Sequence, residues 1–493
     1  MSVISQQTFA DYKDDVGYTR LQADLGSSTP AGRGVAVAHV EAAIGASETD
    51  VGAWMPDVSA TQFNGKRIVD RSSPLSNGVS GHATGVGGVF YGDDGMASGI
   101  MNVNVYSADN WLIDGFLKTG HEIKPLLSAS RIANHSWVGS MEGEDISAQV
   151  AKENAVRVLK RVDWLVEEDE FIQLVAMNNG SINQPLLGNS YNSIAVGRTD
   201  ANHAQGSIAL DSTYNAARTR PDVVAPVSTT SRATPVVSAA AAMLVEQAHN
   251  AAQGSVSVIS NGDAIFNGER SEVVKAVIMA GADRITSNIS IIEGIDDYRT
   301  DVANQTANGL DSRYGAGQLN VYNNYQIMAA GEQDSVEDGG SETVAVMGYD
   351  YDEAFGGAEG TNAHASYVLD TIMDDKQQLT ASLVWNIDIE NNGDEFLFSA
   401  VASLSDLDLY LFDVTGEREL LINSSTSEFD NTENIWSFVE QGHDYRIDVT
   451  AADGESFNRD YALAWKVSAV PVPAAVWFFV SGLLGLFAAK RYV

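Results

Sequence analysis

The stretch Arg220–Met243, RPDVVAPVSTTSRATPVVSAAAAM, joins an apolar run to an alanine-rich segment with strong helix-forming composition. Proline suits a first helical turn because it has no backbone N–H to leave unpaired, so we expect a helix to begin near Pro235. Ser231 then lies at a helix N-terminus, where unpaired N–H groups and the helix dipole favour a developing oxyanion. Ser231 is therefore a candidate nucleophile. The alternative is that the Thr-Thr-Ser cluster only caps the helix.

Composition limits the classes of protein that the chain can belong to. Its 493 residues and 44% hydrophobic content are enough for two or three domains with a sizeable core. The formal net charge of -37, without a long Lys/Arg run, argues against binding to nucleic acid or to anionic membranes. The chain has no cysteine, which excludes disulfides and thiolate metal sites.

Apolar runs alternate with helical patterns over the first two thirds of the chain. SGHATGVGGVFYG at 80–92 reads as a glycine-rich helix start, and apolar residues follow helical spacing over 146–168. The expected strands are 34–41, 130–139 and 171–177. Alternation of this kind predicts an α/β domain whose mostly parallel sheet is covered by helices.

The composition changes near residue 335, where the chain becomes acidic and rich in glycine. Short alternating runs follow, namely LTASLVWNI, DLDLYLFD, DYRIDVT and YALAWKV. They predict a separate antiparallel domain of the β-sandwich or jelly-roll kind. We therefore divide the chain into residues 1–332, 333–468 and 469–493.

The last of these segments predicts a membrane helix. The apolar run 474–489 is somewhat shorter than the roughly 20 residues of a typical span and is followed by Lys490 and Arg491. A buried core helix is the alternative.

Val470–Ala474, VPVPA, resembles the VPxPA or PEP-type sorting signals of exported bacterial surface proteins. That resemblance implies export to the cell envelope or beyond, and a processing protease that acts on the tail. No charged leader with an apolar run opens the printed sequence, so we expect a signal peptide upstream of it.

Three residues in the first domain are candidate partners of Ser231. Glu41 ends the apolar run GVAVAHV, His82 opens the small-residue run HATGVGG, and Asn178 follows FIQLVAM. The ends of strands in α/β folds are where sites are usually built. Each also has a simpler interpretation: Glu41 as a cap, His82 as a core histidine or part of a weak phosphate loop, and Asn178 as a turn former.

Taken in chain order, these motifs resemble those of the subtilases, the subtilisin-like serine proteases. The resemblance covers roughly residues 10–330 and rests on GRGVAVAHVE, SGHATGVGG, GMASGI, NHSWVG, AMNNG, RPDVVAP, TTSRATPVVSA, EVVKAVIMAGA and YGAGQLN. It implies a subtilisin-like three-layer domain that hydrolyses peptide bonds in peptide or protein substrates without a required cofactor.

The same resemblance implies the roles of single residues. It assigns Ser231 as the nucleophile, His82 as the general base and Glu41 as the acid that orients the base, and it places Asn178 in the oxyanion hole. Extended substrate would bind along Ser136, Trp137, Val138 and Gly139. Core packing is an equally good interpretation of Trp137.

The chain departs from the usual subtilase pattern at four positions. Glu41 replaces aspartate, Gly85 replaces the second histidine, Thr229 replaces the glycine before Thr-Ser, and Arg232 replaces a methionine. Two alternative functions therefore stay open: a pseudoprotease that binds peptides without cutting them, and a surface-displayed adhesion protein.

Acidic residues of the second domain suggest a structural ion. Asp406 and Asp408 are two apart in DLDLYL, and Asp430 follows in DNTEN. Carboxylate oxygens of this kind can hold calcium, and some C-terminal β-domains of subtilases have similar runs. A solvated acidic face is the alternative.

Overall fold

The computed structural model describes residues 11–469, except for 48, 184–185, 260–261, 291, 338–341, 357–363, 371, 373–376, 394–396, 417 and 453–458. The predicted membrane helix and sorting motif fall in residues 470–493, outside this range. Within the described residues, none of the helices combines the length and the apolar character that crossing a membrane requires.

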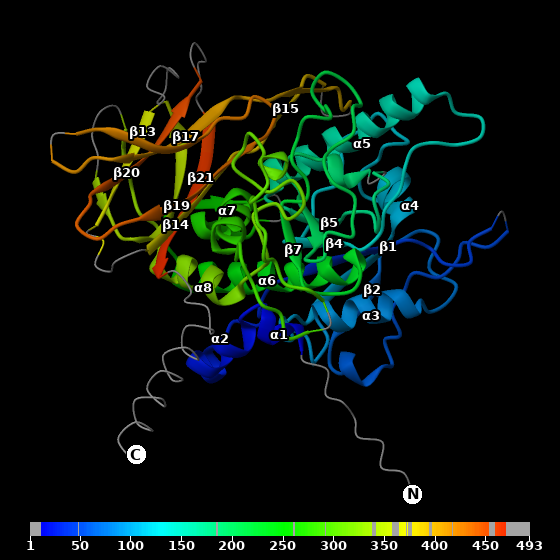
Figure 1. Ribbon diagram of the computed structural model, residues 1–493. Coiled ribbons are helices and arrows are strands. Elements are labelled where there is room, and N and C mark those ends of the chain that lie inside the picture. The colour runs from blue at the N-terminus through cyan, green and yellow to red at the C-terminus, as the bar shows by residue number, and fades with distance from the viewer. Residues whose placement is uncertain are drawn as a thin grey trace, which may run out of the picture.

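A seven-stranded parallel sheet forms the centre of the first domain (Figure 1). Each strand is short, and most are buried along their length, as expected when helices cover both faces of a sheet. The spatial order is β2 (Arg67–Asp70), β3 (Asn102–Ser107), β1 (Val37–Glu41), β4 (Ile132–His135), β5 (Ile172–Ala176), β6 (Ile194–Arg198) and β7 (Val223–Ala225). The predicted α/β class is confirmed.

Helices cover the two faces of this sheet. Side chains of β1 alternate between them: Val37 packs in the core under α3 (Gly81–Phe90) and α6 (Thr230–Ala251), and Val40 in the core under α5 (Ala148–Asp169). In Figure 1 α5 lies above the sheet, and α3 and α6 lie below it. The remaining helices and small strands are α1 (Tyr12–Asp15), α2 (Tyr18–Leu25), α4 (Ala108–Asn110), α7 (Ser271–Gly281), α8 (Val321–Ala330), β8 (Val256–Val258) and β9 (Ala264–Phe266).

The second domain is a sandwich of two mainly antiparallel sheets, as the alternating runs predict. One sheet has the order β10 (Val336–Glu337), β13 (His364–Leu369), β20 (Tyr445–Ala451), β17 (Leu407–Asp413) and β18 (Leu420–Ser425), with β11 (Glu342–Val344) parallel to β13. The other has the order β12 (Met347–Phe355), β21 (Arg459–Ala469), β14 (Gln377–Val384) and β19 (Thr432–Val439). A hairpin of β15 (Asp388–Asn391) and β16 (Ala400–Ser403) lies against α5.

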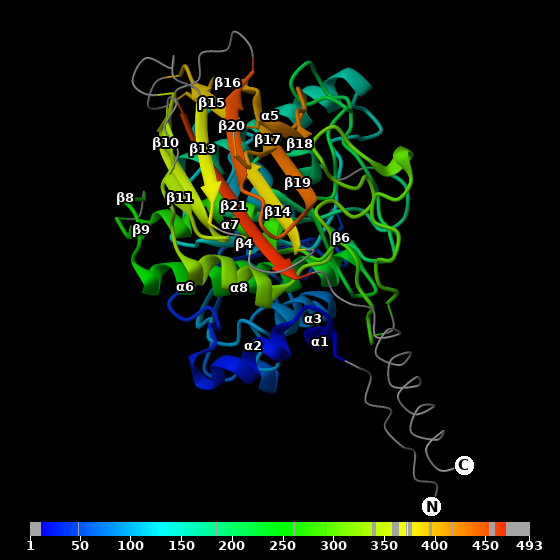
Figure 2. The same ribbon diagram turned by 60° about the vertical axis from the view of Figure 1, so that its left-hand side comes forward.

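The four-stranded sheet of the sandwich is buried on both faces. Leu463 points into the sandwich core, whereas its neighbours Ala462 and Ala464 belong to the core of the first domain. The sheet packs on α7, as Figure 2 shows, and the Thr380 hydroxyl donates to the Ala280 carbonyl at 2.7 Å. A shared apolar core therefore joins the two domains.

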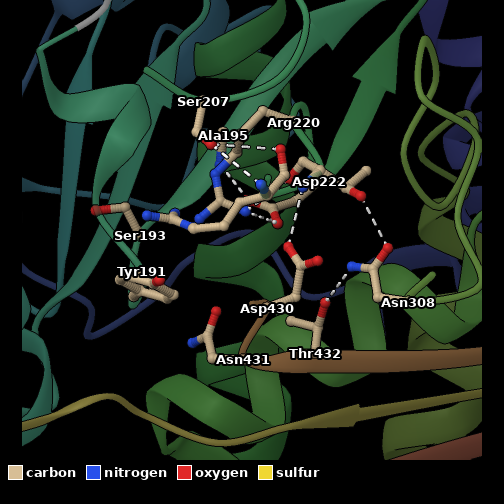
Figure 3. Close-up of polar contacts among 12 residues, drawn as sticks. Tyr191, Ser193, Ala195, Ser207, Arg220, Asp222, Asn308, Asp430, Asn431 and Thr432 are labelled. Carbon is tan, nitrogen blue, oxygen red and sulfur yellow. Dashed lines mark hydrogen bonds and ion pairs between the residues drawn. The ribbon is translucent and has the colours of Figure 1, made fainter. Parts of the chain in front are cut away.

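A buried polar network adds to this contact between the domains (Figure 3). The Thr219 N–H donates to Oδ1 of Asp430 at 3.0 Å, and Nδ2 of Asn308 donates to the Thr432 hydroxyl at 3.2 Å. The other carboxylate oxygen of Asp430 accepts from the Ser427 hydroxyl at 2.9 Å. Protein donors thus occupy both oxygens of Asp430.

The three calcium candidates have different surroundings. Asp430 is at the domain interface, whereas Asp408 accepts a hydrogen bond from the Tyr410 hydroxyl at 3.0 Å. In the ranges that the structure describes, no three histidine or acidic side chains gather in a way that would hold a metal ion. Asp406 directly precedes β17 and Asp408 lies within it, and both residues are partly buried. Calcium binding at these residues stays a prediction.

Candidate active site

The candidate residues meet at the carboxyl edge of the parallel sheet. Glu41 is the last residue of β1, and Asn178 follows β5, with only β4 between these two strands. Helices α3 and α6, which carry His82 and Ser231, follow β2 and β7 and so begin at this edge as well. The sheet topology therefore brings together residues that are up to 190 positions apart, Glu41 and Ser231 (231 minus 41).

His82 is the second residue of α3, whose start is fixed by Ser80. The Ser80 hydroxyl accepts from the Ala83 N–H at 3.1 Å, as an N-cap does. From this position Nδ1 of His82 lies 2.8 Å from Oε2 of Glu41. An ionised carboxylate only accepts, so Nδ1 carries the hydrogen and Nε2 is left as the basic nitrogen. The acid is 2% exposed at its side chain and the imidazole 41%, so the base faces solvent while its partner is buried.

The same contact shifts the pKa values of both groups. The hydrogen bond to Glu41 raises the pKa of His82, against a weaker opposing effect of burial. Burial raises the pKa of Glu41, but the hydrogen bonds from His39 and His82 outweigh it and leave the pKa below its ordinary value. The carboxylate therefore stays ionised, and the imidazole has increased affinity for a proton.

Ser231 is the second residue of α6, and Pro235 is the sixth. The prediction that Ser231 lies at a helix N-terminus is confirmed, but α6 starts at Thr230, so Pro235 comes after the first turn in which we expected it. The reason is a cap from elsewhere in the chain: Oδ1 of Asn179 accepts from the Thr230 N–H at 3.0 Å. Thr229 is the N-cap residue by position, yet its side chain makes no cap hydrogen bond. The Thr-Thr-Ser cluster thus does not cap its own helix, and the hydroxyl of Ser231 is not used for capping.

Thr229 fits its position without backbone strain. Its φ of -145° and ψ of 152° are extended values that any residue adopts, so the backbone does not require the glycine that subtilases usually have there. Its Oγ1 lies 3.2 Å from Oγ of Ser231. No hydrogen bond joins Ser231 to His82 among the contacts of the described residues, although α3 and α6 pack together. Catalytic hydrogen bonds are often long in enzymes without substrate.

The turn after β5 contributes two asparagines with different contacts. Nδ2 of Asn178 donates to the Ile182 carbonyl at 2.8 Å, and Asn179 caps α6. An amide nitrogen has two hydrogens, so Asn178 keeps one for a further acceptor. The sequence prediction overlooked Asn179, although the Asn-Asn pair in MNNG was a visible signal.

The predicted substrate strand is shorter than its sequence pattern suggests. β4 ends at His135, and Ser136–Gly139 continue beyond the sheet. Val138 is 40% exposed, and the Trp137 ring is half-buried against His135, with centroids 5.9 Å apart. Trp137 is therefore partly packed in the core and partly accessible to a ligand at the surface.

A cavity of about 270 Å³ lies beside this segment. The Leu186 N–H donates to the Gly139 carbonyl at 2.9 Å, and this bond links the segment to the turn that carries Asn178. Most of the cavity lining is apolar, from Met141, Ala148, Ala151, Ala155, Ile182, Leu186, Ile208 and Leu210. Its polar members are Ser140, Glu142, Lys152, Asn183 and Asn189. The cavity is a suitable site for an apolar side chain of a ligand.

Two buried residues behind Glu41 were also absent from the sequence prediction. Nε2 of His39 lies 2.9 Å from Oε1 of Glu41, and Nδ1 of His39 lies 2.9 Å from the Tyr91 hydroxyl. The sequence could have indicated His39, because side chains two residues apart on a strand point to the same face, and His39 therefore lies beside Glu41.

Comparisons with known proteins give only distant similarities. No family model matches the chain, and no curated protein matches it. Among solved structures, the prenylagaramide maturation protease PagA has 15% identity and a TM-score of 0.38, covering 63% of this chain and 97% of its own. A protease from Pseudoalteromonas arctica has 13% identity and a TM-score of 0.37, covering 65% and 99%. The pre-peptidase C-terminal domain of a Bacillus anthracis collagenase has 10% identity and a TM-score of 0.18, covering 27% and 100%. The functional assignment therefore depends on the side chains of this chain itself.

Proposed function

We propose that the protein is a serine endopeptidase that acts through Glu41, His82 and Ser231. The observation that carries this proposal is the 2.8 Å hydrogen bond between buried Glu41 and half-exposed His82 at the carboxyl edge of the sheet. Ser231 is in the first turn of the helix that packs on α3. An ionised acid, an oriented imidazole and a hydroxyl at a helix N-terminus are the parts that acyl transfer needs.

The first chemical step uses the basic nitrogen that Glu41 leaves free. Nε2 of His82 takes the proton of the Ser231 hydroxyl as Oγ attacks the carbonyl carbon of a peptide. The intermediate expels the amine, which takes the proton from His82, and an acyl-enzyme remains. Water then attacks this ester as it gives a proton to His82, the bond to Oγ breaks, and the acyl group leaves as a carboxylic acid. His82 returns the proton to Oγ, which regenerates Ser231. Glu41 keeps its charge throughout and stabilises the imidazolium.

Two N–H groups are available for the oxyanion of the intermediate. The N–H of Ser231 is in the first turn of α6, where backbone donors have no acceptor within the helix. The second amide hydrogen of Asn178 is the other donor, since the first is bound to Ile182. Both donors are fixed before substrate arrives, which is the condition for effective electrostatic stabilisation.

Extended substrate would lie along Ser136–Gly139 as an added strand. The cavity beside Gly139 would then receive a substrate side chain close to the scissile bond. Its apolar lining predicts a preference for an apolar side chain of medium size, because burial of such a group stabilises binding by about 25 cal/mol per Å². A peptide library with a single varied position, analysed by mass spectrometry, tests this preference.

The pseudoprotease function is supported by one observation. Oγ of Ser231 contacts Oγ1 of Thr229 at 3.2 Å and forms no hydrogen bond with His82. A protein that only binds peptides would keep this arrangement when occupied. Reaction with a fluorophosphonate probe separates the two functions, because the probe needs an activated serine. Labelling supports the peptidase, and peptide binding without labelling supports the pseudoprotease.

We further propose that the protein works outside the cytoplasm and is attached through residues 469–493, at least transiently. The support is the sequence pattern of VPVPA, an apolar run and a basic end. Fractionation of cells that express the full gene tests this location. Recovery with the envelope or medium supports it, and recovery with the cytoplasm contradicts it.

A further inference from the structure

We propose that His39 is a positioning residue, which holds Glu41 against His82 and is itself fixed by Tyr91. This role rests on the serine-endopeptidase function proposed above. It concerns a histidine that does not touch substrate and that the triad does not include.

The four side chains form one continuous chain of hydrogen bonds. Tyr91 contacts Nδ1 of His39 at 2.9 Å, and Nε2 of His39 contacts Oε1 of Glu41 at 2.9 Å. Oε2 of Glu41 then contacts Nδ1 of His82 at 2.8 Å. Each oxygen of the acid therefore has its own imidazole, one on either side.

The donors in this chain can be assigned from chemistry. Burial raises the pKa of Tyr91, so the phenol keeps its proton. Nδ1 of His39 is the partner of this hydroxyl among the described residues, so we assign the hydroxyl as the donor. The carboxylate of Glu41 only accepts, so Nε2 of His39 carries the hydrogen. A single neutral tautomer of His39 satisfies both contacts. The ring is thereby fixed, and its N–H points at the acid.

The arrangement also joins two elements at two places. His39 and Glu41 are on β1, whereas His82 is at the start of α3 and Tyr91 directly follows its last residue. The chain of hydrogen bonds runs from the residue after α3 through β1 to the start of α3. It therefore fixes both ends of the helix against the strand, and with them the distance between acid and base.

Gly87 provides the space that this arrangement needs. A Cβ atom at Gly87 would lie 2.5 Å from the Tyr91 hydroxyl oxygen and 3.1 Å from the Phe63 ring. All three rings around this point are buried: His39, Phe63 and Tyr91. The hydroxyl is thus enclosed, with His39 as its hydrogen-bond partner in the interior.

These contacts give a physical reason for glutamate at position 41. A glutamate side chain has one more rotatable bond than aspartate and loses more conformational entropy when it is ordered. A second hydrogen-bond donor at Oε1 offsets this cost by restricting the carboxylate to one orientation. His39 supplies that donor from the same face of β1, two residues before the acid.

The surroundings of Glu41 contain one more histidine. His135, at the end of β4, interacts with the acid over a longer range, and burial lowers the pKa of His135 to about 4. It is therefore neutral at ordinary pH. A change in the pKa of His82 in a variant can then be attributed to Glu41 and His39, and not to a change in the charge of His135.

The test measures the pKa of His82 by NMR in full-length protein that carries Ser231→Ala. This variant cannot cleave itself, and the measurement does not depend on proteolysis. In His39→Leu the acid loses its second anchor, so the pKa of His82 falls toward its ordinary value of about 6.5. His39→Gln, which keeps an N–H near Nε2, retains the raised pKa. Tyr91→Phe, which removes one oxygen atom, lowers the pKa of His82 by a smaller amount.

Matched measurements in protein with Ser231 intact follow the effect on turnover. His39→Leu lowers kcat by up to about 100-fold and leaves KM unchanged, because misplacement of a catalytic group affects the chemical step. In a Glu41→Ala background the same change has no further effect on kcat. His249→Leu is the control: this histidine lies near the end of α6, far from Ser231, and pairs with Glu269 of a later segment.

The two proposals fail in different ways. If the protein does not cleave peptides but His39→Leu still lowers the pKa of His82, the endopeptidase function is wrong and the positioning role stands. If both His39→Leu and Tyr91→Phe fold and leave the pKa of His82 at the wild-type value, the positioning role is overturned whatever the activity.

Discussion

Oε2 of Glu41 and Nδ1 of His82 lie 2.8 Å apart, with the acid buried and the base half-exposed. This contact spans 41 positions of sequence and links the end of β1 to the start of α3. It determines the tautomer of His82 and raises its pKa. The carboxylate of Glu41 thus reaches the imidazole of His82 from the end of β1.

Glu41→Gln keeps the size of the side chain and removes its charge. We expect kcat/KM to fall on the order of 10,000-fold, as it does when triad acids are lost, because the imidazolium is no longer stabilised. Asp413→Asn is the matched control, since Asp413 pairs with Nδ1 of His443 at 2.7 Å in the second domain. Wild-type turnover in Glu41→Gln, measured with a fluorogenic peptide, would show that another acidic residue orients His82.

The pH dependence of kcat/KM follows from the raised pKa of His82. The imidazole must be neutral to accept the serine proton, so activity is present above this pKa and is lost as pH falls through it. We expect the midpoint of the acid limb above the ordinary value of about 6.5. In Glu41→Gln the residual activity should have its midpoint at lower pH, because the charge that raises the pKa is gone. A midpoint that stays fixed or moves upward would be inconsistent with the assigned pair.

The two neighbouring asparagines should give opposite results. Asn178→Ala removes an oxyanion donor and should lower kcat roughly 100- to 1000-fold, a range taken from subtilisin, with little change in thermal stability. Asn179→Ala removes the acceptor for the Thr230 N–H and should cost about 1 kcal/mol of stability, as loss of a helix cap does. Circular dichroism melting and steady-state kinetics on both variants check this. If Asn179→Ala loses more kcat than Asn178→Ala, the oxyanion donor has been assigned to the wrong residue.

Asp430 should contribute to the stability of both domains together. Asp430→Ala leaves the Thr219 N–H and the Ser427 hydroxyl without their acceptor, which we expect to cost roughly 1 to 3 kcal/mol. The shared core predicts one calorimetric transition, shifted to lower temperature in the variant. Asp444→Ala, at an exposed position of the second domain, serves as the control and should melt like wild type. Two separate transitions in the wild-type protein would mean that the domains unfold independently.

The sequence was sufficient to predict the parallel α/β sheet and the antiparallel sheets that follow it. The buried strands and covering helices could be predicted because apolar periodicity depends only on residues near one another in the sequence. Glu41, His82 and Asn178 could be chosen as site candidates because each lies at the end of a strand or the start of a helix. Their convergence at one edge of the sheet follows from parallel topology.

Contacts between distant segments could not be predicted in the same way. The start of α6 depends on Asn179, which lies 51 positions before Thr230, so local propensity placed the helix start too late, near Pro235. His39, which holds Glu41, is itself held by Tyr91 from a distant part of the chain, and that contact could not be predicted. The position of His39 beside Glu41 could be predicted from strand alternation alone. Ser136–Gly139 fit a strand pattern but extend past the last strand pairing, which ends at His135.

The most direct test of the central claim is labelling of the purified protein with a fluorophosphonate probe, followed by peptide mapping. We predict one adduct per chain, on Ser231, that is absent from Ser231→Ala and strongly reduced in His82→Ala. An adduct that persists in Ser231→Ala, or a folded wild-type protein that takes up no probe, would contradict the claim that Ser231 is an activated nucleophile.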